Sequence, residues 1–220
     1  QLPTTLSSML DRFELLSVTI SNSVNGDTGS LEAPDDVKSR PVPVPNARID
    51  VEEVGRGLWY LTGQSHHSLV VEFEDHLTLV EAPQDDIRTL AVIETARGLS
   101  PGKPLTEVIN THHHFDHSGG IRAAVSEGLT VITHALNRNF YLDSVSRTHL
   151  LSPDAFQRNP QAIRIETVSE AYELSDALRT VQIFPIVDSP HADGLLMVYF
   201  PSERALAVAD VYSTPNSTVT

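Results

Sequence analysis

The segment from Val108 to Gly120, VINTHHHFDHSGG, contains four of the chain's ten histidines within six residues. In an extended segment, His112 and His114 project to the same side, because alternate residues of a strand share a face. Two imidazole nitrogens placed in this way can bind one cation at about 2.0 to 2.1 Å. Asp116 and His117 follow where the chain turns, and they offer a carboxylate and an imidazole to a neighbouring cation. The spacing therefore predicts a metal site that has room for two ions.

A surface histidine tract or an expression tag is the alternative explanation of this segment. A tag would be terminal and would lack an interleaved aspartate, whereas this cluster is internal and follows an apolar, strand-like run. His113 projects to the opposite side from its neighbours, so we expect it to lie outside the ligand set. Gly119 and Gly120 are expected to permit a tight turn into a helix.

The composition limits the class of protein. A chain of 220 residues with 40% apolar residues can bury a core. It contains no apolar run of the roughly 18 residues that a membrane helix needs, so we expect a soluble protein with no membrane partner. The formal net charge of −14 repels phosphate backbones, which argues against a nucleic-acid partner. A small-molecule substrate is the expected partner, and the oligomeric state is open.

The chain has no cysteine, which excludes disulfides and thiolate metal ligands. Any metal must therefore be held by imidazoles and carboxylates. This composition is compatible with a cytoplasmic location and with a secreted or periplasmic one. The sequence begins with Gln1 and shows no secretory signal, so we expect that a leader or a longer N-terminus has been removed.

The character of the sequence changes near residue 46. Residues 1–46 include an acidic, loop-like stretch and the run PVPVP at residues 41–45, which favours an extended connector. We expect an irregular N-terminal arm or linker over 1–46, with a short amphipathic helix considered around Ser8 to Leu16. Residues 47–220 are expected to form one domain.

Short apolar runs alternate with helical patterns along this expected domain. An arrangement of this kind predicts an α/β fold whose strand ends carry loops rich in His and Asp. Strands are expected at residues 59–61, 68–73, 76–81, 107–110, 129–133, 180–184, 195–200 and 205–209, and helices at residues 88–98, 121–127 and 135–142.

Two parts of the sequence match the motifs of a known family. Thr111–His117, THHHFDH, fits the pattern T-H-x-H-x-D-H, and Gly119 and Gly120 follow it. Downstream, Ser189–Gly194, SPHADG, precedes a strand-like run and Asp210. In these motifs the chain resembles the metallo-β-lactamase superfamily over roughly residues 55 to 215. The resemblance implies an αββα sandwich, expected to be incomplete at the C-terminus.

The resemblance also implies which metal ion each site residue would bind. His112, His114 and His191 would hold one metal, Asp116 and His117 would belong to the other, and Asp210 would bridge the two. Glu81 occupies the place where many relatives carry an aspartate behind the ligands. The leading cofactor is Zn²⁺, two ions per chain, although iron or manganese would also accept nitrogen and oxygen ligands.

One feature departs from the family pattern. Relatives with a complete dinuclear site usually supply one more histidine beyond the bridging aspartate, and no histidine follows His191 in this chain. We therefore expect either that the sequence lacks its C-terminal part or that the second metal site is incomplete.

The expected reaction is hydrolysis of a small-molecule ester, lactone, amide (β-lactam-like) or thioester, because zinc activates water near neutral pH. Asp116 would be the catalytic residue that orients this water or passes a proton. His67, in the loop of residues 65–68, and His134 are candidates for the rim of the site. The alternatives are an iron-dependent member that oxidises sulfur compounds, similar to persulfide dioxygenases, and an inactive fragment. Metal content distinguishes these alternatives.

Overall fold

The computed structural model describes residues 5–10, 13–19, 35–40, 46–149 and 152–211. The chain divides into two compact units, Gln1–Val44 and Pro45–Thr220. The first unit contains the strands β1 (Thr5–Leu10) and β2 (Phe13–Thr19) and the helix α1 (Asp35–Lys38).

The first unit differs from the irregular arm expected from the sequence. The residues around Ser8 to Leu16, considered as a helix, belong instead to β1 and β2, which pair antiparallel. An isolated helix of about nine residues is marginal in water. Pairing two adjacent segments satisfies backbone groups of both, and the Thr and Val residues within the two strands favour an extended backbone.

A seven-stranded sheet organises the second unit. Its strands lie in the order β3-β4-β5-β6-β7-β8-β9, antiparallel from β3 to β6 and parallel from β6 to β9. Parallel strands are covered on both faces, which explains why all four residues of β6 are buried. The strands span β3 (Asp50–Gly55), β4 (Leu58–Thr62), β5 (Ser68–Glu72), β6 (Leu77–Val80), β7 (Leu105–Ile109), β8 (Thr130–His134) and β9 (Ile165–Val168).

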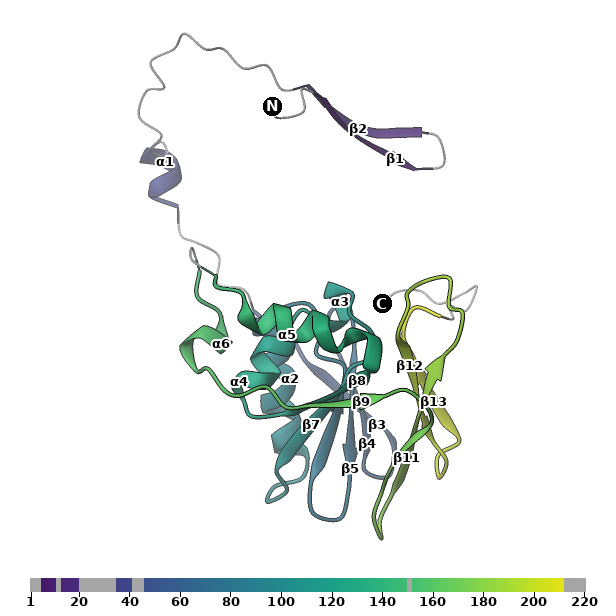
Figure 1. Cartoon of the computed structure of the whole chain (residues 1–220). Coiled ribbons are helices and arrows are strands. Elements are labelled where there is room, and N and C mark those ends of the chain that lie inside the picture. Colours follow the sequence, from purple (N-terminus) through teal and green to yellow (C-terminus); the bar gives the residue numbers. More distant parts are fainter. Residues whose placement is uncertain (1–4, 11–12, 20–34, 41–45, 150–151, 212–220) are drawn as a thin grey trace. The chain divides into compact units, whose positions relative to one another are not determined.

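Helices cover one face of this sheet (Figure 1). One core cluster joins the two layers: Val92 and Ile93 of α2 and Val125 of α4 pack with Leu79 and Val108 of the sheet. The helices are α2 (Asp86–Leu99), α3 (Phe115–Ser118), α4 (Ile121–Ser126), the 3₁₀ turn η1 (Ala135–Asn137), α5 (Arg138–Ser146) and α6 (Ala155–Arg158). In the described part of the chain, none of the helices has the length and apolarity needed to cross a membrane.

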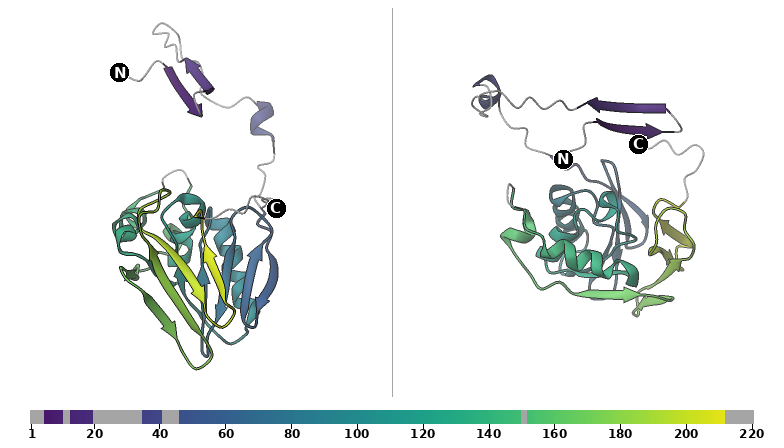
Figure 2. Two further views of the ribbon diagram at one scale, coloured as in Figure 1. Left: turned by 90° about the vertical axis from the view of Figure 1, so that its right-hand side faces the viewer. Right: turned by 45° about the horizontal axis from the view of Figure 1, so that its top comes forward.

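A second, four-stranded sheet packs on the other face (Figure 2). It is antiparallel, in the order β10-β11-β12-β13. A second core cluster fills the space between the sheets, with Val80 and Ile109 from the large sheet and Ile183 and Val198 from the small one. The strands span β10 (Tyr172–Ser175), β11 (Thr180–Ile186), β12 (Leu195–Phe200) and β13 (Ala205–Val208).

The layers confirm the α/β class predicted from the sequence. Helices, a mixed sheet and an antiparallel sheet give three of the four layers of an αββα sandwich. The fourth layer of such a sandwich would be helices packed on the outer face of the small sheet. The structure has no helix among the described residues 159–211 and so describes no helices from that layer.

Three strands of the second unit were not expected from the sequence: β3, β9 and β10. All three lie at the edges of their sheets. Five of the six residues of β3 are exposed, two of the four residues of β9 are exposed, and β10 alternates between half-buried and exposed positions. Edge strands with polar faces carry little of the apolar periodicity that predicts a strand.

Gly119 and Gly120 serve a different purpose from the one expected. Gly119 has φ −61° and Gly120 φ −95°, values that any residue adopts. A Cβ atom would lie 2.0 Å from the carbonyl oxygen of Gln84 at Gly119 and 1.9 Å from Oγ1 of Thr89 at Gly120. The glycines are therefore required by the close approach of α3 and α4 to the start of α2.

A buried ion pair joins α4 to α6. Arg122 donates from Nη2 to Oδ1 of Asp154 at 3.1 Å and also binds this carboxylate through Nε. The Arg122 and Asp154 side chains are 7% and 9% exposed. Nη1 of Arg122 donates to the backbone oxygen of Ser144 at 2.5 Å, so the same guanidinium also holds the end of α5.

Asp154→Ala is expected to destabilise the fold by about 3 to 5 kcal/mol, because it leaves the buried Arg122 cation without a carboxylate to offset its charge. Urea unfolding followed by circular dichroism measures this. Asp143→Ala is the matched control, since the Asp143 and Arg147 side chains are 59% and 68% exposed and the pair contributes about 0.3 to 0.5 kcal/mol. Equal losses in the two variants would contradict the assignment.

Candidate metal centre

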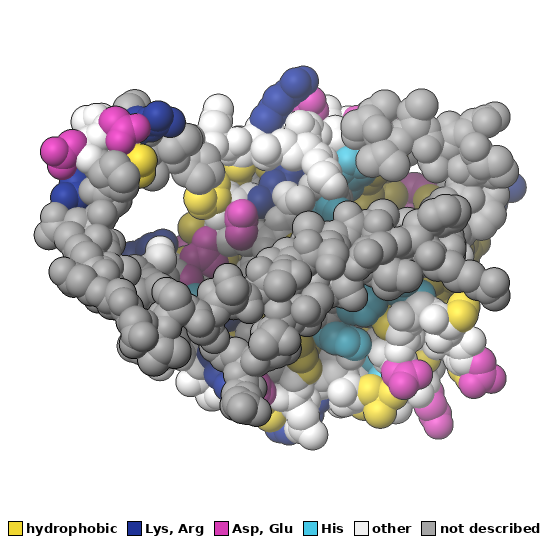
Figure 3. Space-filling view, turned by 90° about the horizontal axis from the view of Figure 1, so that it is seen from above, with side chains coloured by type: hydrophobic (Ala, Val, Ile, Leu, Met, Phe, Trp, Pro, Cys, Tyr) yellow, Lys and Arg dark blue, Asp and Glu magenta, His cyan; other side chains and the backbone are white. Residues whose placement is uncertain are grey.

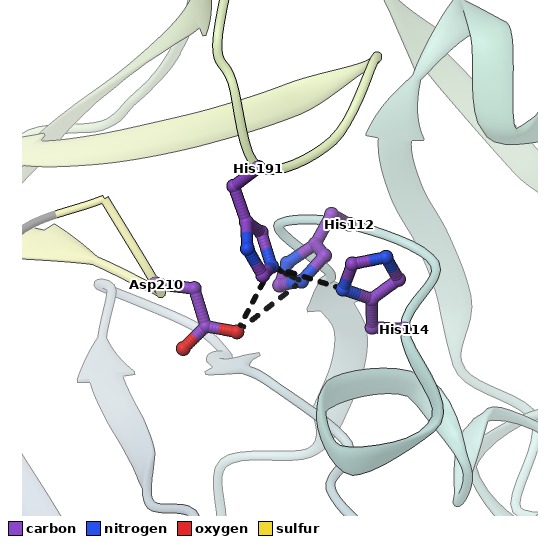
Figure 4. Close-up of side chains that lie close together, drawn as sticks. All are labelled: His112, His114, His191 and Asp210. Carbon is purple, nitrogen blue, oxygen red and sulfur yellow. Dashed lines mark hydrogen bonds and ion pairs between the residues drawn. The ribbon is translucent and has the colours of Figure 1, made fainter. Parts of the chain in front are cut away.

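The predicted site residues gather at the end of the sheets where β7, β12 and β13 carry their loops. His112 and His114 follow β7, His191 lies between β11 and β12, and Asp210 follows β13. Figure 4 shows the three imidazoles and the Asp210 carboxylate pointing toward one another. Histidine side chains also reach the surface on this face of the molecule (Figure 3). One loop of the large sheet and two loops of the small sheet thus meet at one point.

His112, His114, His191 and Asp210 form the three-histidine group. Nε2 of His191 lies 2.9 Å from Nδ1 of His114 and 3.3 Å from Nε2 of His112. Oδ2 of Asp210 lies 3.2 Å from Nε2 of His191 and 3.6 Å from Nε2 of His112. Ligand atoms at 2.0 to 2.1 Å from a tetrahedral zinc are separated by about 3.3 Å. The donor atoms therefore fit one tetrahedral metal ion.

The electrostatics keep this group ready to bind a cation. Burial, followed by the neighbouring imidazoles of His117 and His114, lowers the pKa of His112 to about 3. Burial and the adjacent His191 ring also lower the pKa of His114. Both rings are consequently neutral near pH 7, with nitrogen lone pairs available to a metal.

His66, Asp116 and His117 form a second cluster, the His66 group. Their three donor atoms lie within 4.8 Å of one another. Nε2 of His66 is 3.1 Å from Oδ2 of Asp116, and Nε2 of His117 is 4.0 Å from the same oxygen. Nε2 of His117 also lies 3.0 Å from Oδ2 of Asp210. Asp210 therefore contacts both groups, as the bridging role expected of it requires.

The charges around the His66 group oppose the effect of burial. Burial disfavours the charged ring of His117, but Glu81, Asp210 and Asp116 outweigh it and raise its pKa. Burial acts against the Asp116 carboxylate, but its own backbone N–H and the rings of His117 and His66 lower its pKa. Negative charge thus surrounds this group and favours a bound cation.

Buried side chains behind the ligands fix the loop that carries them. Oε1 of Glu81 accepts the backbone N–H of Thr111 at 3.0 Å, and Oε2 lies 3.5 Å from Nδ1 of His117. Asn110 donates from Nδ2 to the backbone oxygen of His117 at 2.8 Å. Tyr141 donates to Oδ1 of Asn110 and to the backbone oxygen of His112 at 3.2 Å. Sequence reasoning identified Glu81 but not Asn110 or Tyr141, which carry no motif.

The remaining predicted residues lie outside both groups. His67 binds the hydroxyl of Tyr60 and lines the adjacent cavity. Nδ1 of His134 accepts the N–H of Leu136 at 3.1 Å and caps η1. His113 faces Oδ1 of Asn137 at 3.2 Å. Sequence reasoning placed the loop of residues 65–68 at the rim but selected His67, whereas His66 is the residue that reaches Asp116, since a pair of adjacent loop histidines gives no signal of which one turns inward.

A cavity of about 510 Å³ adjoins the His66 group. His66, His117 and Asp210 form its polar end, and Leu58, Phe200 and Leu206 contribute to an apolar wall. Pockets of about 300 to 1,000 Å³ with an apolar lining and few polar groups are typical of small-molecule sites. The arrangement can therefore place an apolar body beside His66, His117 and Asp210.

Comparison with known proteins gives a consistent result for the fold. The family model described as the metallo-beta-lactamase superfamily matches residues 61–217. Among solved structures, the DIM-1 metallo-beta-lactamase has a TM-score of 0.60 and 19% identity, over 80% of this chain and 75% of that chain. A metallo-beta-lactamase from Pontibacter korlensis has a TM-score of 0.56 and 16% identity, over 72% and 70%. No curated protein matches significantly.

Proposed function

Because the chain belongs to the metallo-beta-lactamase superfamily, we propose that it is a metal-dependent hydrolase of a small-molecule ester, lactone, amide (β-lactam-like) or thioester. The observation that carries the proposal is the convergence of His112, His114 and His191 with Asp210. Three imidazoles suit zinc, and the fourth tetrahedral position is left to the Asp210 carboxylate or to an exchangeable water molecule.

The metal and the protein have separate tasks in this proposal. Zinc held by imidazoles lowers the pKa of water toward about 7 and polarises a carbonyl group. The chain's own side chains place and neutralise the ion: His112, His114 and His191 hold it, and Asp210 offsets its charge. Asp116, which is half-buried, would orient a water molecule and pass a proton to the leaving group.

The cavity supports a small, partly apolar substrate. Its apolar wall would bury an acyl or ring portion, while the scissile carbonyl would face the polar end formed by His66, His117 and Asp210. The acidic balance of the chain, with a formal net charge of −14, disfavours a nucleic-acid substrate. We therefore place the substrate among neutral or weakly charged small molecules, with no nucleic-acid or membrane partner.

The test is elemental analysis of the untagged protein, combined with a panel of chromogenic ester, lactone, β-lactam and thioester substrates. The expected result is zinc in the purified protein and hydrolysis of at least one class, lost with a chelator and restored by added zinc. Protein that is loaded with zinc and hydrolyses no member of the panel would contradict the proposal. Bound iron together with dioxygen-dependent oxidation of a sulfur compound would favour the oxidative alternative.

A further inference from the structure

We infer that His66 supplies the third protein side chain of a second metal site, together with Asp116 and His117. The inference rests on the proposed function, in which the three-histidine group holds the first ion. The family resemblance assigns Asp116 and His117 to a second ion but gives no role to His66. The structure brings His66 to them from a loop between β4 and β5, about fifty residues earlier in the sequence.

The contact between His66 and Asp116 suits a shared cation. The side chains of His66 and Asp116 are 29% and 28% exposed, and Nε2 of His66 faces Oδ2 of Asp116 at 3.1 Å. Nδ1 of His66 lies 2.8 Å from Oγ of Ser65. When Nδ1 carries the proton and donates to Ser65, Nε2 is left as a lone pair directed at a carboxylate. Two electron-pair donors at this distance are stabilised by a cation between them.

His117 approaches the same space from the other side. Its ring lies edge-on to that of His66, with centroids 5.1 Å apart, and its Nε2 contacts Oδ2 of Asp210 at 3.0 Å. Glu81 lies 3.5 Å behind Nδ1 of His117, the arrangement in which a carboxylate orients a metal-ligating imidazole. The His66 group with Asp210 alongside offers two imidazoles and two carboxylates, a donor set that zinc accepts.

The backbone of the loop is held in a strained conformation that directs His66 inward. His66 has φ 60°, in the left-handed region, where a histidine is uncommon. The buried guanidinium of Arg88 donates from Nη2 to the backbone oxygen of His66 at 3.3 Å and to that of Thr62 at 3.1 Å. Strain that neighbouring groups maintain is characteristic of functional sites. The next residue, His67, turns to Tyr60 and provides an internal comparison.

The test is titration of the metal-free full chain with Zn²⁺ by calorimetry and with Co²⁺ by visible absorption. His66→Asn is compared with His67→Asn, because asparagine tolerates the left-handed conformation and leaves the loop intact. The expected result is two equivalents bound by the wild type and by His67→Asn. In His66→Asn, the affinity for the second equivalent of metal falls by about 100-fold, while the affinity for the first equivalent is unchanged.

Each other outcome has a defined meaning. A second equivalent bound equally well by His66→Asn would overturn the assignment, as would a wild type that binds only one. Equal loss in both variants would assign the effect to the loop and not to the His66 imidazole. Retention of the first equivalent shows that His66→Asn is folded. Failure of the hydrolase proposal is separate, because it appears as protein that binds both ions and hydrolyses no substrate.

Discussion

His114→Ala is expected to weaken zinc binding by the three-histidine group by about 100- to 1,000-fold, since four-ligand sites bind with about 10 to 16 kcal/mol, on the order of 3 kcal/mol per ligand. The remaining rings, His112 and His191, stay 3.3 Å apart but lack the third nitrogen. Hydrolysis at limiting metal should fall in parallel. Metal analysis after gel filtration measures the loss.

His113→Ala is the control for this variant. It removes an adjacent imidazole that contacts Asn137 and Phe140 and belongs to neither group. The metal content of His113→Ala should therefore equal that of the wild type. Unchanged metal content in His114→Ala would remove the basis of the proposed function.

Asp210→Asn is expected to lower the affinity for both equivalents of metal, each on the order of 100-fold, because the Asp210 carboxylate contacts both groups. Oδ2 of Asp210 lies 3.0 Å from His117 and 3.2 Å from His191. Asparagine retains the shape and tolerates the φ of 57° found at Asp210, so the change is mainly the loss of negative charge. At a zinc concentration that saturates the wild type, the variant should be nearly free of metal.

Asp193→Asn provides the matched control for Asp210→Asn. Asp193 is an exposed carboxylate two residues after His191, and it lies outside both groups. Its replacement should leave both equivalents and hydrolysis unchanged. Selective loss of only one equivalent in Asp210→Asn would show that Asp210 serves a single ion and would contradict its bridging role.

The two expected phenotypes separate the roles of the groups. His114→Ala removes a metal-binding side chain whose contacts with other predicted ligands lie within the three-histidine group, whereas Asp210→Asn acts on both groups. His66→Asn completes the set, because the metal-binding side chains that His66 contacts are Asp116 and His117. Together the three variants assign each equivalent of metal to named residues without reference to the substrate.

Buried hydrogen bonds behind the ligands hold the loop after β7. Thr111 is tied to Glu81, and Asn110 is tied to the backbone of His117. Each of these buried polar groups would cost about 1 to 3 kcal/mol if its partner were removed. These hydrogen bonds position the loop that carries His112 and His117, and such support reduces the reorganisation that metal binding requires.

The sequence alone determined the α/β class and the local half of the site. Helices and central strands carry clear apolar periodicity. The spacing of His112, His114, Asp116 and His117 keeps these four side chains close together, because they belong to one short segment. The absence of cysteine limited the ligands to nitrogen and oxygen. The resemblance supplied His191 and Asp210 as partners. The edge strands were missed, because an exposed edge does not require alternating apolar residues.

Tertiary structure decided what depends on long-range contacts. Gly119 and Gly120 look like turn glycines in the sequence, but the approach of Gln84 and Thr89 is what requires them. His66 and His67 are chemically identical neighbours, and only the left-handed backbone at His66, held by Arg88, selects which one reaches Asp116. Sequence spacing encodes which residues of one segment share a face. Which distant loops meet that face is determined by the packing of the two sheets and their helices, because that packing alone brings those loops together.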